Sequence, residues 1–435
     1  MEVSLGDAQV DRGAGWRTVS EGRIDAPRGT RDVLPDEHRV RRHILNVAAG
    51  LFDAYGFGQI STPTFEHTEV FSRGVGASTD IVRKEMYTFE DRGHRSITLR
   101  PEGTAGVVRA FVEHGMHKLP LPVKLWYTGP MFRYEAPQSG RFREHTQIGA
   151  EAIGTNDPLL DAEVIALASS LYSALGVPSV RLRVGSLGDD ATRRPYREAL
   201  VDYLSPHRSD LPEDARDRMV DNPMRLFDSK DPRVIAVMHE APRLIDHLSD
   251  AAAEHFATVC AALDAIGIAY ERDPDLVRGL DYYTHTVFEF TCDRLGAQSG
   301  IGGGGRYDGL VAQLGGPELS GIGFGSGIER IVLALASGDA ALPEQSIDIY
   351  FAAVDEQSRN EVFAIMTRLR AKGVSCETDR AGRSLKGMMR QAATLGARRT
   401  VILGPREREQ GIAIIRSMLT GDQIEVGLSD LEGSL

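Results

Sequence analysis

Cysteine, tryptophan and long apolar runs are scarce in this sequence, and each shortage excludes a class of protein. The 435 residues include three cysteines, Cys260, Cys292 and Cys376, and two tryptophans. The cysteines lie far apart, with no CxxC pair and no Cys/His cluster at zinc spacing. We therefore expect neither a disulfide framework nor a zinc site. No apolar run is long enough to cross a bilayer, so we expect no membrane partner and a cytoplasmic location.

Acidic residues outnumber basic ones, and the formal net charge is -12. That charge argues against a general nucleic-acid coat but allows a partner held by local basic patches. A hydrophobic share of 42% and a charged share of 26% are typical of globular proteins, and 435 residues predict two or three domains. Residues 1–20 mix Asp, Glu, Gly and Arg without an apolar segment. We expect a frayed tail over residues 1–26, not a secretory signal.

Residues 125–154 are the most informative stretch, and they predict two strands joined by a polar, basic loop. Aromatic residues indicate the strands, and Pro137 with Gly140 marks the turn. Side chains alternate faces along a strand. Polar residues therefore share a face in two places: Arg133 with Glu135, and Gln147 with Gly149 and Glu151. Such faces build either a polar pocket or a solvated hairpin surface, and the segment alone leaves both open.

Periodicity along the rest of the chain predicts regions of different character. Residues 186–270 are dense in Asp, Arg and Pro and favour a largely helical insertion. Residues 346–435 alternate strand and helix, which favours a small α/β domain with a largely parallel sheet. Elsewhere we expect helices at 37–55, 101–112, 161–175 and 328–336, and strands at 57–61, 96–100, 280–292 and 321–324.

Two glycine-rich runs invite a nucleotide-binding interpretation. Residues 299–309 lack the GK[ST] ending of a Walker loop, so we expect a turn region or close packing of backbone against a ligand or strand. In residues 321–335 a glycine-dotted strand precedes an apolar helix with Glu329 and Arg330 in its first turn. An adenine on that strand with Arg330 at a phosphate is one interpretation; tight strand–helix packing is the other.

Residues 380–406 contain no acidic residue. Arg383, Lys386 and Arg390 fall on roughly one face of a predicted helix at 384–395. This pattern indicates an anion-binding surface, although an ordinary solvated helix has the same spacing.

Together these segments resemble the class II aminoacyl-tRNA synthetases, and among them the histidyl-tRNA synthetase family, from about residue 27 to the C-terminus. Three general class II signatures match in order: the helix–strand–Pro segment ending at Pro63, the FRYE hairpin from Phe132, and GIGFGSGIER at 321–330. LVRGLDYYTHTVFEF at 276–290 and GGGGRYDGLV at 302–311 match segments peculiar to the histidine enzymes. TLRPEGTAGVVR at 98–109 also matches.

The resemblance implies an α+β fold: a class II antiparallel sheet flanked by helices, with a helical insertion and a C-terminal α/β anticodon-binding domain. The implied domains are the tail at 1–26, the catalytic core at 27–185 and 271–337, the insertion at 186–270, and the anticodon-binding domain at 346–435. The helix and strand before Pro63 imply a homodimer. The insertion is expected over the tRNA acceptor arm.

The implied reaction joins L-histidine to tRNA(His) with ATP through a histidyl-adenylate. Two anions must meet, so permanently charged guanidinium groups suit the catalytic roles. Arg133 and Arg278 match arginines placed at the α-phosphate, and Arg330 matches one at the far end of the triphosphate. The full implied ATP-binding set is Arg133, Glu135, Arg141, Arg143, Arg278, Gly325 and Arg330. Mg²⁺ bridges the phosphates and is not held by protein alone; no organic cofactor is implied.

Histidine recognition is implied by a second set of positions. Glu102, Thr104 and Gln147 match residues that face the ammonium group. Glu151 matches an acceptor for the ring N–H, with Tyr283 at the other ring nitrogen, and this pairing rejects analogues that lack the nitrogens. Gly103, Tyr282 and Tyr307 belong to the same pocket. Arg278 and Tyr283 differ in strand parity, so both face the pocket only if Gly279 introduces a turn or bulge.

One departure and one rival interpretation accompany the resemblance. The family often carries an arginine where this chain has Ala136, which removes one cation from the hairpin loop. The rival is the synthetase-like regulatory subunit of ATP phosphoribosyltransferase, which typically lacks the RGLDYYT arginine and the C-terminal domain. Arg278 and the basic C-terminal domain favour the enzyme. The 276–290 segment also argues against prolyl- or threonyl-specific class II enzymes.

Overall fold

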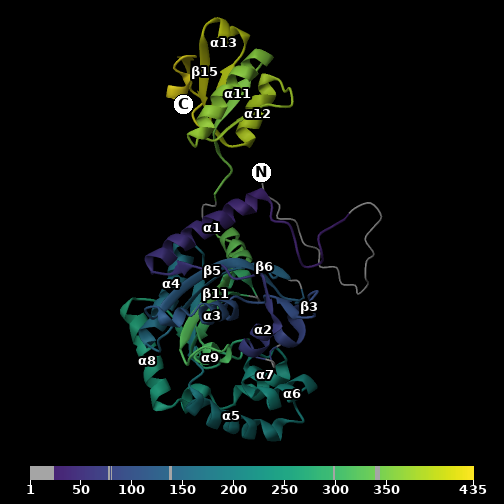
Figure 1. Ribbon diagram of the computed structural model, residues 1–435, viewed down its shortest axis with the longest axis vertical. Coiled ribbons are helices and arrows are strands. Elements are labelled where there is room, and N and C mark those ends of the chain that lie inside the picture. The colour runs from purple at the N-terminus through teal and green to yellow at the C-terminus, as the bar shows by residue number, and fades with distance from the viewer. Residues whose placement is uncertain (1–23, 77–78, 80, 137–139, 297–298, 339–342) are drawn as a thin grey trace. The chain divides into compact units, whose positions relative to one another are not determined.

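The computed structural model describes residues 24–435 apart from 77–78, 80, 137–139, 297–298 and 339–342 (Figure 1). The chain forms two compact units, one of residues 1–33 and 44–340 and the other of residues 34–43 and 341–435. Of the predicted tail, only residues 24–26 belong to the described ranges. No helix within those ranges is both long and apolar enough to span a membrane.

An eight-stranded sheet forms the centre of the first unit, in the order β1-β5-β6-β11-β10-β9-β7-β8. Its strands are β1 (Gly58–Gln59), β5 (Val123–Phe132), β6 (Glu144–Ile153), β7 (Val180–Ser186), β8 (Glu271–Arg272), β9 (Thr284–Cys292), β10 (Gly300–Arg306) and β11 (Gly321–Gly327). The six long strands are antiparallel, which confirms the predicted sheet. The two-residue edge strands pair in parallel instead, because long crossovers separate β1 from β5 and β7 from β8.

The first crossover carries a small antiparallel sheet in the order β2-β4-β3. Its elements are β2 (Phe65–His67), α2 (Thr68–Gly74), a π-helical turn (Ile81–Glu85), β3 (Tyr87–Glu90), β4 (Ser96–Leu99), α3 (Thr104–Glu113) and a 3-10 turn (Met116–Lys118). Helix α3 starts later than predicted, because the Pro101–Gly103 stretch forms a bend that brings Glu102 to the helix N-terminus.

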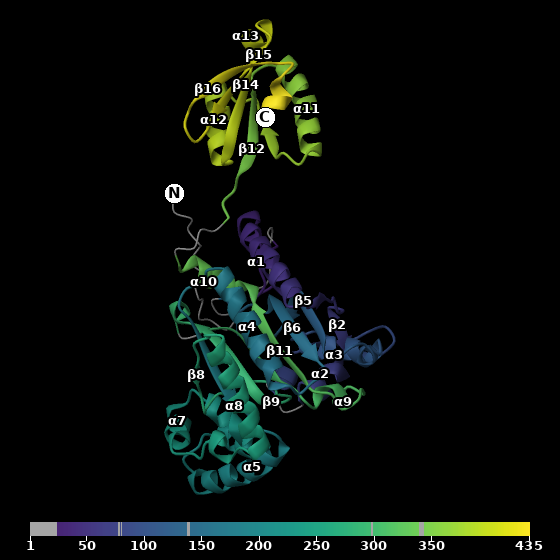
Figure 2. The same cartoon turned by 90° about the vertical axis from the view of Figure 1, so that its left-hand side faces the viewer.

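Helices cover one face of the large sheet: α1 (Pro35–Ala54), α4 (Pro158–Ala174) and α10 (Ile328–Ala336). Phe52 of α1 stacks on Trp126 of β5 with ring centroids 5.0 Å apart, and Tyr172 of α4 lies 5.0 Å from Phe290 of β9. The neighbouring Tyr127 packs on the other side, against α3. Figure 2 shows α4 and α3 on opposite sides of the sheet. Since α3 covers only part of its face, the remainder is left for polar side chains.

Residues 300–309 correct one prediction, because most of them form a strand and not a turn. Strand β10 (Gly300–Arg306) lies between β9 and β11 in the middle of the sheet. A Cβ at Gly304 would overlap the carbonyl oxygen of Gly323 and lie 2.8 Å from Phe324 Cβ. A Cβ at Gly303 would lie 2.7 Å from the Phe288 carbonyl oxygen. Close backbone packing, the alternative interpretation of these glycines, is confirmed.

The predicted insertion is helical, as expected. It contains α5 (Asp190–Leu204), α6 (Glu213–Asp221), α7 (Pro232–His239) and α8 (Asp250–Ala265), with 3-10 turns at Ser205–His207, Pro223–Asp228 and Leu244–His247. Residues from α5 to α7, including Leu200, Leu226 and Met238, enclose an apolar core of their own. Helix α8 packs instead against α4 (Figure 1), so the last insertion helix joins the main body of the first unit.

The second unit is built on a five-stranded sheet in the order β13-β12-β14-β15-β16. Its elements are β12 (Ile347–Ala353), α11 (Glu356–Ala371), β13 (Cys376–Thr378), α12 (Leu385–Thr394), β14 (Ala397–Leu403), α13 (Pro405–Glu409), β15 (Ile412–Ser417), β16 (Gln423–Gly427) and α14 (Leu431–Ser434). The expectation of a largely parallel sheet is wrong for half of the pairings. β13 and β14 lie parallel to β12, but β15 and β16 follow through short connections that permit only antiparallel pairing.

We predict that Gly304→Ala lowers the free energy of unfolding of the first unit by about 1–3 kcal/mol, because the added methyl group has no room between β10 and β11. Gly50→Ala is the matched control. Gly50 is an exposed position of α1, and no neighbouring atom lies within 4 Å of the added Cβ. Alanine there leaves stability unchanged or raises it slightly. Thermal unfolding followed by calorimetry compares the variants, and equal Tm values for both would contradict the packing argument.

Candidate active site

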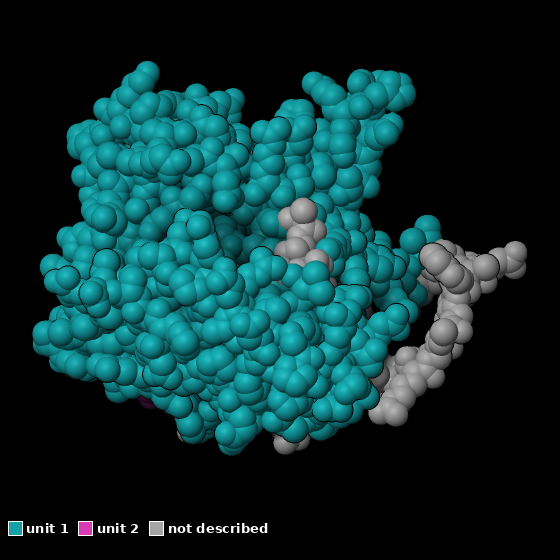
Figure 3. Space-filling model, turned by 90° about the horizontal axis from the view of Figure 1, so that it is seen from below, with its two compact units in different colours: residues 1–33, 44–340 teal, residues 34–43, 341–435 magenta. Residues whose placement is uncertain are grey.

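A polar pocket occupies the open face of the large sheet. Residues from the β5–β6 hairpin, β9, β10, β11, the start of α3 and the segment before β9 line it. With α5 and α6 toward the viewer, the surface of the first unit is hollowed near its middle (Figure 3). The predicted site residues that line the pocket are Glu102, Thr104, Arg133, Glu135, Arg141, Gln147, Arg278, Tyr282, Tyr283, Gly325 and Arg330. Four others, Gly103, Arg143, Glu151 and Tyr307, do not line it.

Three arginines are held in the pocket by acceptors of the surrounding chain. Arg133 Nε donates to the Pro101 carbonyl at 2.8 Å, and Arg330 Nε donates to the Gly300 carbonyl at 3.1 Å. Arg278 Nη1 donates to Glu289 Oε1 at 3.3 Å, and its Nε has no hydrogen-bond partner among the described residues. Guanidinium groups that are oriented by acceptors of the chain suit a ligand that carries several phosphates.

Arg278 and Tyr283 both line the pocket, although strand parity separates them. Residues 273–283 form turns and bends, and β9 starts only at Thr284. The turn that the prediction required at Gly279 is therefore present.

Glu102 closes the N-terminus of α3. Its carboxylate accepts hydrogen bonds from the backbone N–H groups of Thr104 at 2.7 Å and Ala105 at 2.9 Å. Burial raises the pKa of Glu102, and these two hydrogen bonds oppose the rise. Gly103 makes this geometry possible, because a Cβ there would overlap the Tyr127 ring.

Glu151 lies beneath the pocket, fully buried. Tyr307 Oη donates to Glu151 Oε2 at 2.7 Å, and Thr104 Oγ1 donates to Oε1 at 2.7 Å. Burial raises the pKa of Glu151 to about 8, so the carboxyl carries a proton through much of the neutral range. Thr104 contacts the pocket above and Glu151 below, and therefore links the two.

The glycines of β11 make room for side chains of β6. A Cβ at Gly325 would overlap the Gln147 amide, and a Cβ at Gly323 would overlap the Glu151 carboxyl. Gly149 similarly makes room for the Tyr127 ring. Side chains of the neighbouring strand thus fill much of the glycine face that the sequence suggested for an adenine.

Three ionisable pocket residues were not among the predicted site residues: His145, Glu289 and Glu329. Burial and the nearby charge of Arg133 lower the pKa of His145 to about 3, so its ring is neutral. Both Glu329 oxygens accept from the Thr146 N–H at 3.0 Å, which joins α10 to β6. Glu329 was visible in the first turn of its predicted helix. Glu289 follows from strand alternation once the start of β9 is known.

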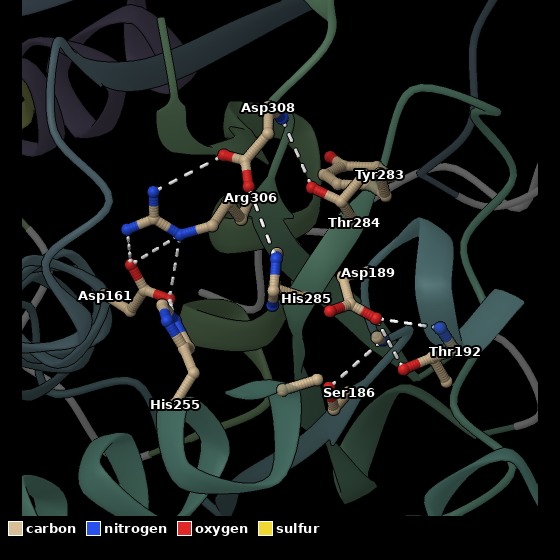
Figure 4. Close-up of polar contacts among 12 residues, drawn as sticks. Asp161, Ser186, Asp189, Thr192, His255, Tyr283, Thr284, His285, Arg306 and Asp308 are labelled. Carbon is tan, nitrogen blue, oxygen red and sulfur yellow. Dashed lines mark hydrogen bonds and ion pairs between the residues drawn. The ribbon is translucent and has the colours of Figure 1, made fainter. Parts of the chain in front are cut away.

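A buried ionic cluster supports the pocket from behind (Figure 4). Arg306 of β10 and Asp161 of α4 pair with both side chains fully buried, and His255 Nε2 of α8 lies 2.8 Å from Asp161 Oδ2. Burial alone would raise the pKa of Asp161, but the His255 hydrogen bond and the Arg306 charge hold it below its ordinary value. Arg306 is the last residue of β10 and precedes Tyr307. The cluster therefore fixes the end of this strand beneath the pocket floor.

Arg143 lies outside the pocket lining, with its guanidinium 3.7 Å from the Tyr134 ring centroid. Glu135 lines the pocket and lies 3.5 Å from Arg141 Nη1. Within the described residues, no group of three or more His, Cys, Asp or Glu side chains is placed to hold a metal ion.

The predicted basic face of the second unit needs one correction. Arg383, Lys386 and Arg390 are all exposed, but Arg383 precedes α12, whose N-cap is Ser384. Arg383 also pairs with Asp379 at 2.7 Å. Asp379 lies one residue before the acid-free stretch, so the composition of residues 380–406 does not reveal this partner of Arg383.

The sheet, the β5–β6 hairpin and the β11–α10 unit together define a class II aminoacyl-tRNA synthetase. The histidyl-tRNA synthetase family model matches residues 29–331, and an anticodon-binding domain model matches residues 348–435. This chain belongs to the histidyl-tRNA synthetase family.

Relatives support that assignment along the chain. A histidine–tRNA ligase of Mycobacterium tuberculosis is 50% identical over 412 residues, covering 94% of this chain and 96% of that protein. One of Rubrobacter xylanophilus is 48% identical over 409 residues, covering 92% and 96%. The apo crystal structure of Staphylococcus aureus histidyl-tRNA synthetase superposes with a TM-score of 0.81 at 39% identity, covering 95% of this chain and 99% of that one.

The raised pKa of Glu151 predicts how stability changes with pH. Between the ordinary value of 4.5 and about 8, the unfolded chain loses this proton and the folded chain keeps it. The free energy of unfolding therefore falls as pH rises through this window, by at most about 1.4 kcal/mol per pH unit. In Glu151→Gln this contribution disappears. Urea unfolding of both proteins from pH 5 to 8 gives the difference, and a difference that stays constant with pH would contradict the buried, protonated carboxyl.

Proposed function

We propose that this protein ligates L-histidine to tRNA(His), using ATP and a histidyl-adenylate intermediate. The observation that carries the proposal is the convergence of Arg133, Arg278 and Arg330 in one pocket that also contains Glu102 and Tyr283. A strongly cationic region beside a region of acids and phenols matches a triphosphate and an amino acid with a polar ring.

The first step joins the histidine carboxylate to the α-phosphate and releases pyrophosphate. Arg133 and Arg278 hold the α-phosphate and stabilise the charge that develops on it, and Arg330 holds the far end of the triphosphate. Each guanidinium is already oriented by an acceptor, so little reorganisation accompanies binding.

Histidine is recognised at both of its ends. Glu102, Thr104 and Gln147 face the ammonium group. Glu151 accepts from the ring N–H and Tyr283 contacts the other ring nitrogen. Tyr282 belongs to the pocket wall, Tyr307 supports it from beneath through its hydrogen bond to Glu151, and Gly103 allows the close approach of Tyr127 beside it.

ATP is contacted further by Glu135, Arg141, Arg143 and Gly325. Mg²⁺ would neutralise phosphate charge when bound, and the Glu135 carboxylate at the pocket edge would contribute to holding it beside the phosphates. The reaction uses no zinc and no organic cofactor.

The other parts of the chain serve the tRNA. The second unit binds the anticodon arm, with Arg383, Lys386 and Arg390 contacting phosphates, and the insertion faces the acceptor arm. Residues 27–185 and 271–337 form the catalytic core, residues 186–270 the insertion, and residues 346–435 the anticodon-binding domain; most of the expected tail at 1–26 lies outside the described residues. The enzyme works in the cytoplasm as a homodimer. Phe65 and Phe89, which are 56% and 47% exposed on the small sheet, support such a subunit interface.

The regulatory-subunit interpretation is less well supported. A structure titled as an ATP phosphoribosyltransferase regulatory subunit/histidyl-tRNA synthetase from Bacillus halodurans shares the fold, with a TM-score of 0.62 at 23% identity. A likeness at 23% identity shows a shared fold and nothing about function. Arg278 in the pocket and the match of residues 348–435 to an anticodon-binding model favour the enzyme.

Arg278→Ala tests the proposed chemistry. We expect the rate of histidine-dependent pyrophosphate exchange to fall at least about 100-fold, because a cation at the reacting phosphate is lost. Histidine affinity, measured by calorimetry, changes little. Arg181→Ala, on β7 and outside the pocket lining, is the control and keeps normal exchange. A wild-type rate in Arg278→Ala would overturn the assignment.

Replacing Arg383, Lys386 and Arg390 together with Ala is expected to weaken tRNA binding and to reduce its salt dependence. The slope of log K against log salt should shrink by about 1–2, since Arg383 is partly neutralised by Asp379. The control replaces Arg359, Arg368 and Lys372, on or next to α11. Helices α11 and α12 pack on opposite faces of the sheet. An unchanged slope in the first variant would count against this surface.

A further inference from the structure

The segment that carries Arg278 has no helix or strand of its own. It runs from Asp273 to Tyr283, between β8 and β9, and we call it the Arg278 loop. It supplies Arg278, Leu280, Tyr282 and Tyr283 to the pocket. Its backbone is tied to the rest of the unit at two points, from Asp273 N–H to the Val184 carbonyl at 2.9 Å and from Asp281 N–H to the Val75 carbonyl at 3.2 Å, so side-chain contacts also set its position.

Side chains of the insertion hold the middle of this loop. Arg225 Nη2 donates to the Gly279 carbonyl at 3.1 Å and to Asp281 Oδ1 at 2.9 Å. Asn222 Nδ2 donates to the same Asp281 oxygen at 3.1 Å. The Arg225–Asp281 pair is largely buried, with side-chain exposures of 14% and 23%, so solvent screens it only weakly.

The insertion also holds both ends of the loop. Arg243 Nη1 lies 2.9 Å from Asp275 Oδ1 near its start, and Arg193 Nη1 donates to the Tyr283 carbonyl at 3.3 Å at its end. Four side chains from separate parts of the insertion thus grip one loop of the pocket. We call Arg193, Asn222, Arg225 and Arg243 the insertion clamp.

Residues of the insertion clamp lie on elements that are packed into the core of the insertion. Arg225 belongs to the 3-10 turn Pro223–Asp228, and its neighbour Leu226 is buried in the separate apolar core of the insertion. Arg193 lies on α5, whose Leu200 contributes to the same core. A displacement of the insertion is therefore transmitted to the Arg278 loop through packed elements.

We propose that Arg225 is a positioning residue for adenylation, which holds the Arg278 loop in its reactive geometry from the insertion. Arg225 does not line the pocket. It acts through Gly279, which follows Arg278 directly in the chain, and Asp281, on the other side of Leu280. A shift of about 1 Å in a reacting or stabilising group costs up to about 100-fold in rate. This inference rests on the proposed function.

A double-mutant cycle of Arg225→Ala and Asp281→Ala tests the clamp by pyrophosphate exchange. We expect kcat to fall about 10–100-fold in each single variant, with KM for histidine within about threefold of wild type. The double variant should be no more than about threefold worse than the poorer single variant, because the two changes share the Arg225–Asp281 pair as their main loss. Arg208→Ala is the control: Arg208 is an exposed insertion arginine whose side chain makes no hydrogen bond or ion pair to the described residues. Its kcat should be normal.

Hydrogen–deuterium exchange supplies a readout that does not depend on activity. In Arg225→Ala, amides of residues 274–283 should exchange faster, while those of α5 keep their protection. Normal kcat in Arg225→Ala, multiplicative effects in the cycle, or loss of protection throughout the insertion would each overturn the proposal. Absence of exchange activity in the wild type would contradict the proposed function instead, and the deuterium result would still decide whether the clamp exists.

Discussion

Repulsion between guanidinium groups is the constraint on which the pocket depends. Arg133, Arg141, Arg278 and Arg330 line one small cavity. Burial, together with the charge of Arg141, lowers the pKa of Arg330. The fold opposes this repulsion by giving arginines fixed acceptors, among them the Pro101 carbonyl and the Glu289 carboxylate. The carbonyl acceptor orients Arg133 without neutralising it, whereas Glu289 offsets part of the charge of Arg278, and the pocket as a whole remains suited to a polyanion.

Glycines in the central sheet leave room for neighbouring side chains and for close strand pairing. Polar side chains of β6 need room above β11, and a Cβ at Gly323 or Gly325 would remove it. On β10 the same residue type allows strand pairing so close that no Cβ fits at Gly304. The glycine-rich motifs therefore shape the pocket floor through packing, and the ionic pair of Arg306 and Asp161 holds that floor from behind.

Local sequence patterns predicted much of this structure, and predictions failed where the role of a residue depends on neighbours outside the local pattern. The hairpin, the insertion helices and the β11–α10 unit carry their own periodicity, and the family motifs located eleven pocket-lining residues. The run at 300–309 was misjudged because consecutive glycines show no alternation, and only its neighbours make it a strand. His145 and Glu289 gave no motif. Asp379 lies just outside the acid-free stretch 380–406, and the ion pair of Arg225 with Asp281 joins segments far apart in the chain.

The catalytic pocket thus depends on elements that never touch the reacting atoms, including the insertion and the buried cluster. In the proposed reaction, the cationic region of the pocket and its acidic, phenolic region act together to activate histidine. The most direct test is exchange of labelled pyrophosphate into ATP by the wild-type protein, with Mg²⁺ and without tRNA, in the presence of each amino acid in turn. We predict exchange with histidine alone. Histidine binding in calorimetry without any exchange would contradict it and would favour the regulatory-subunit function.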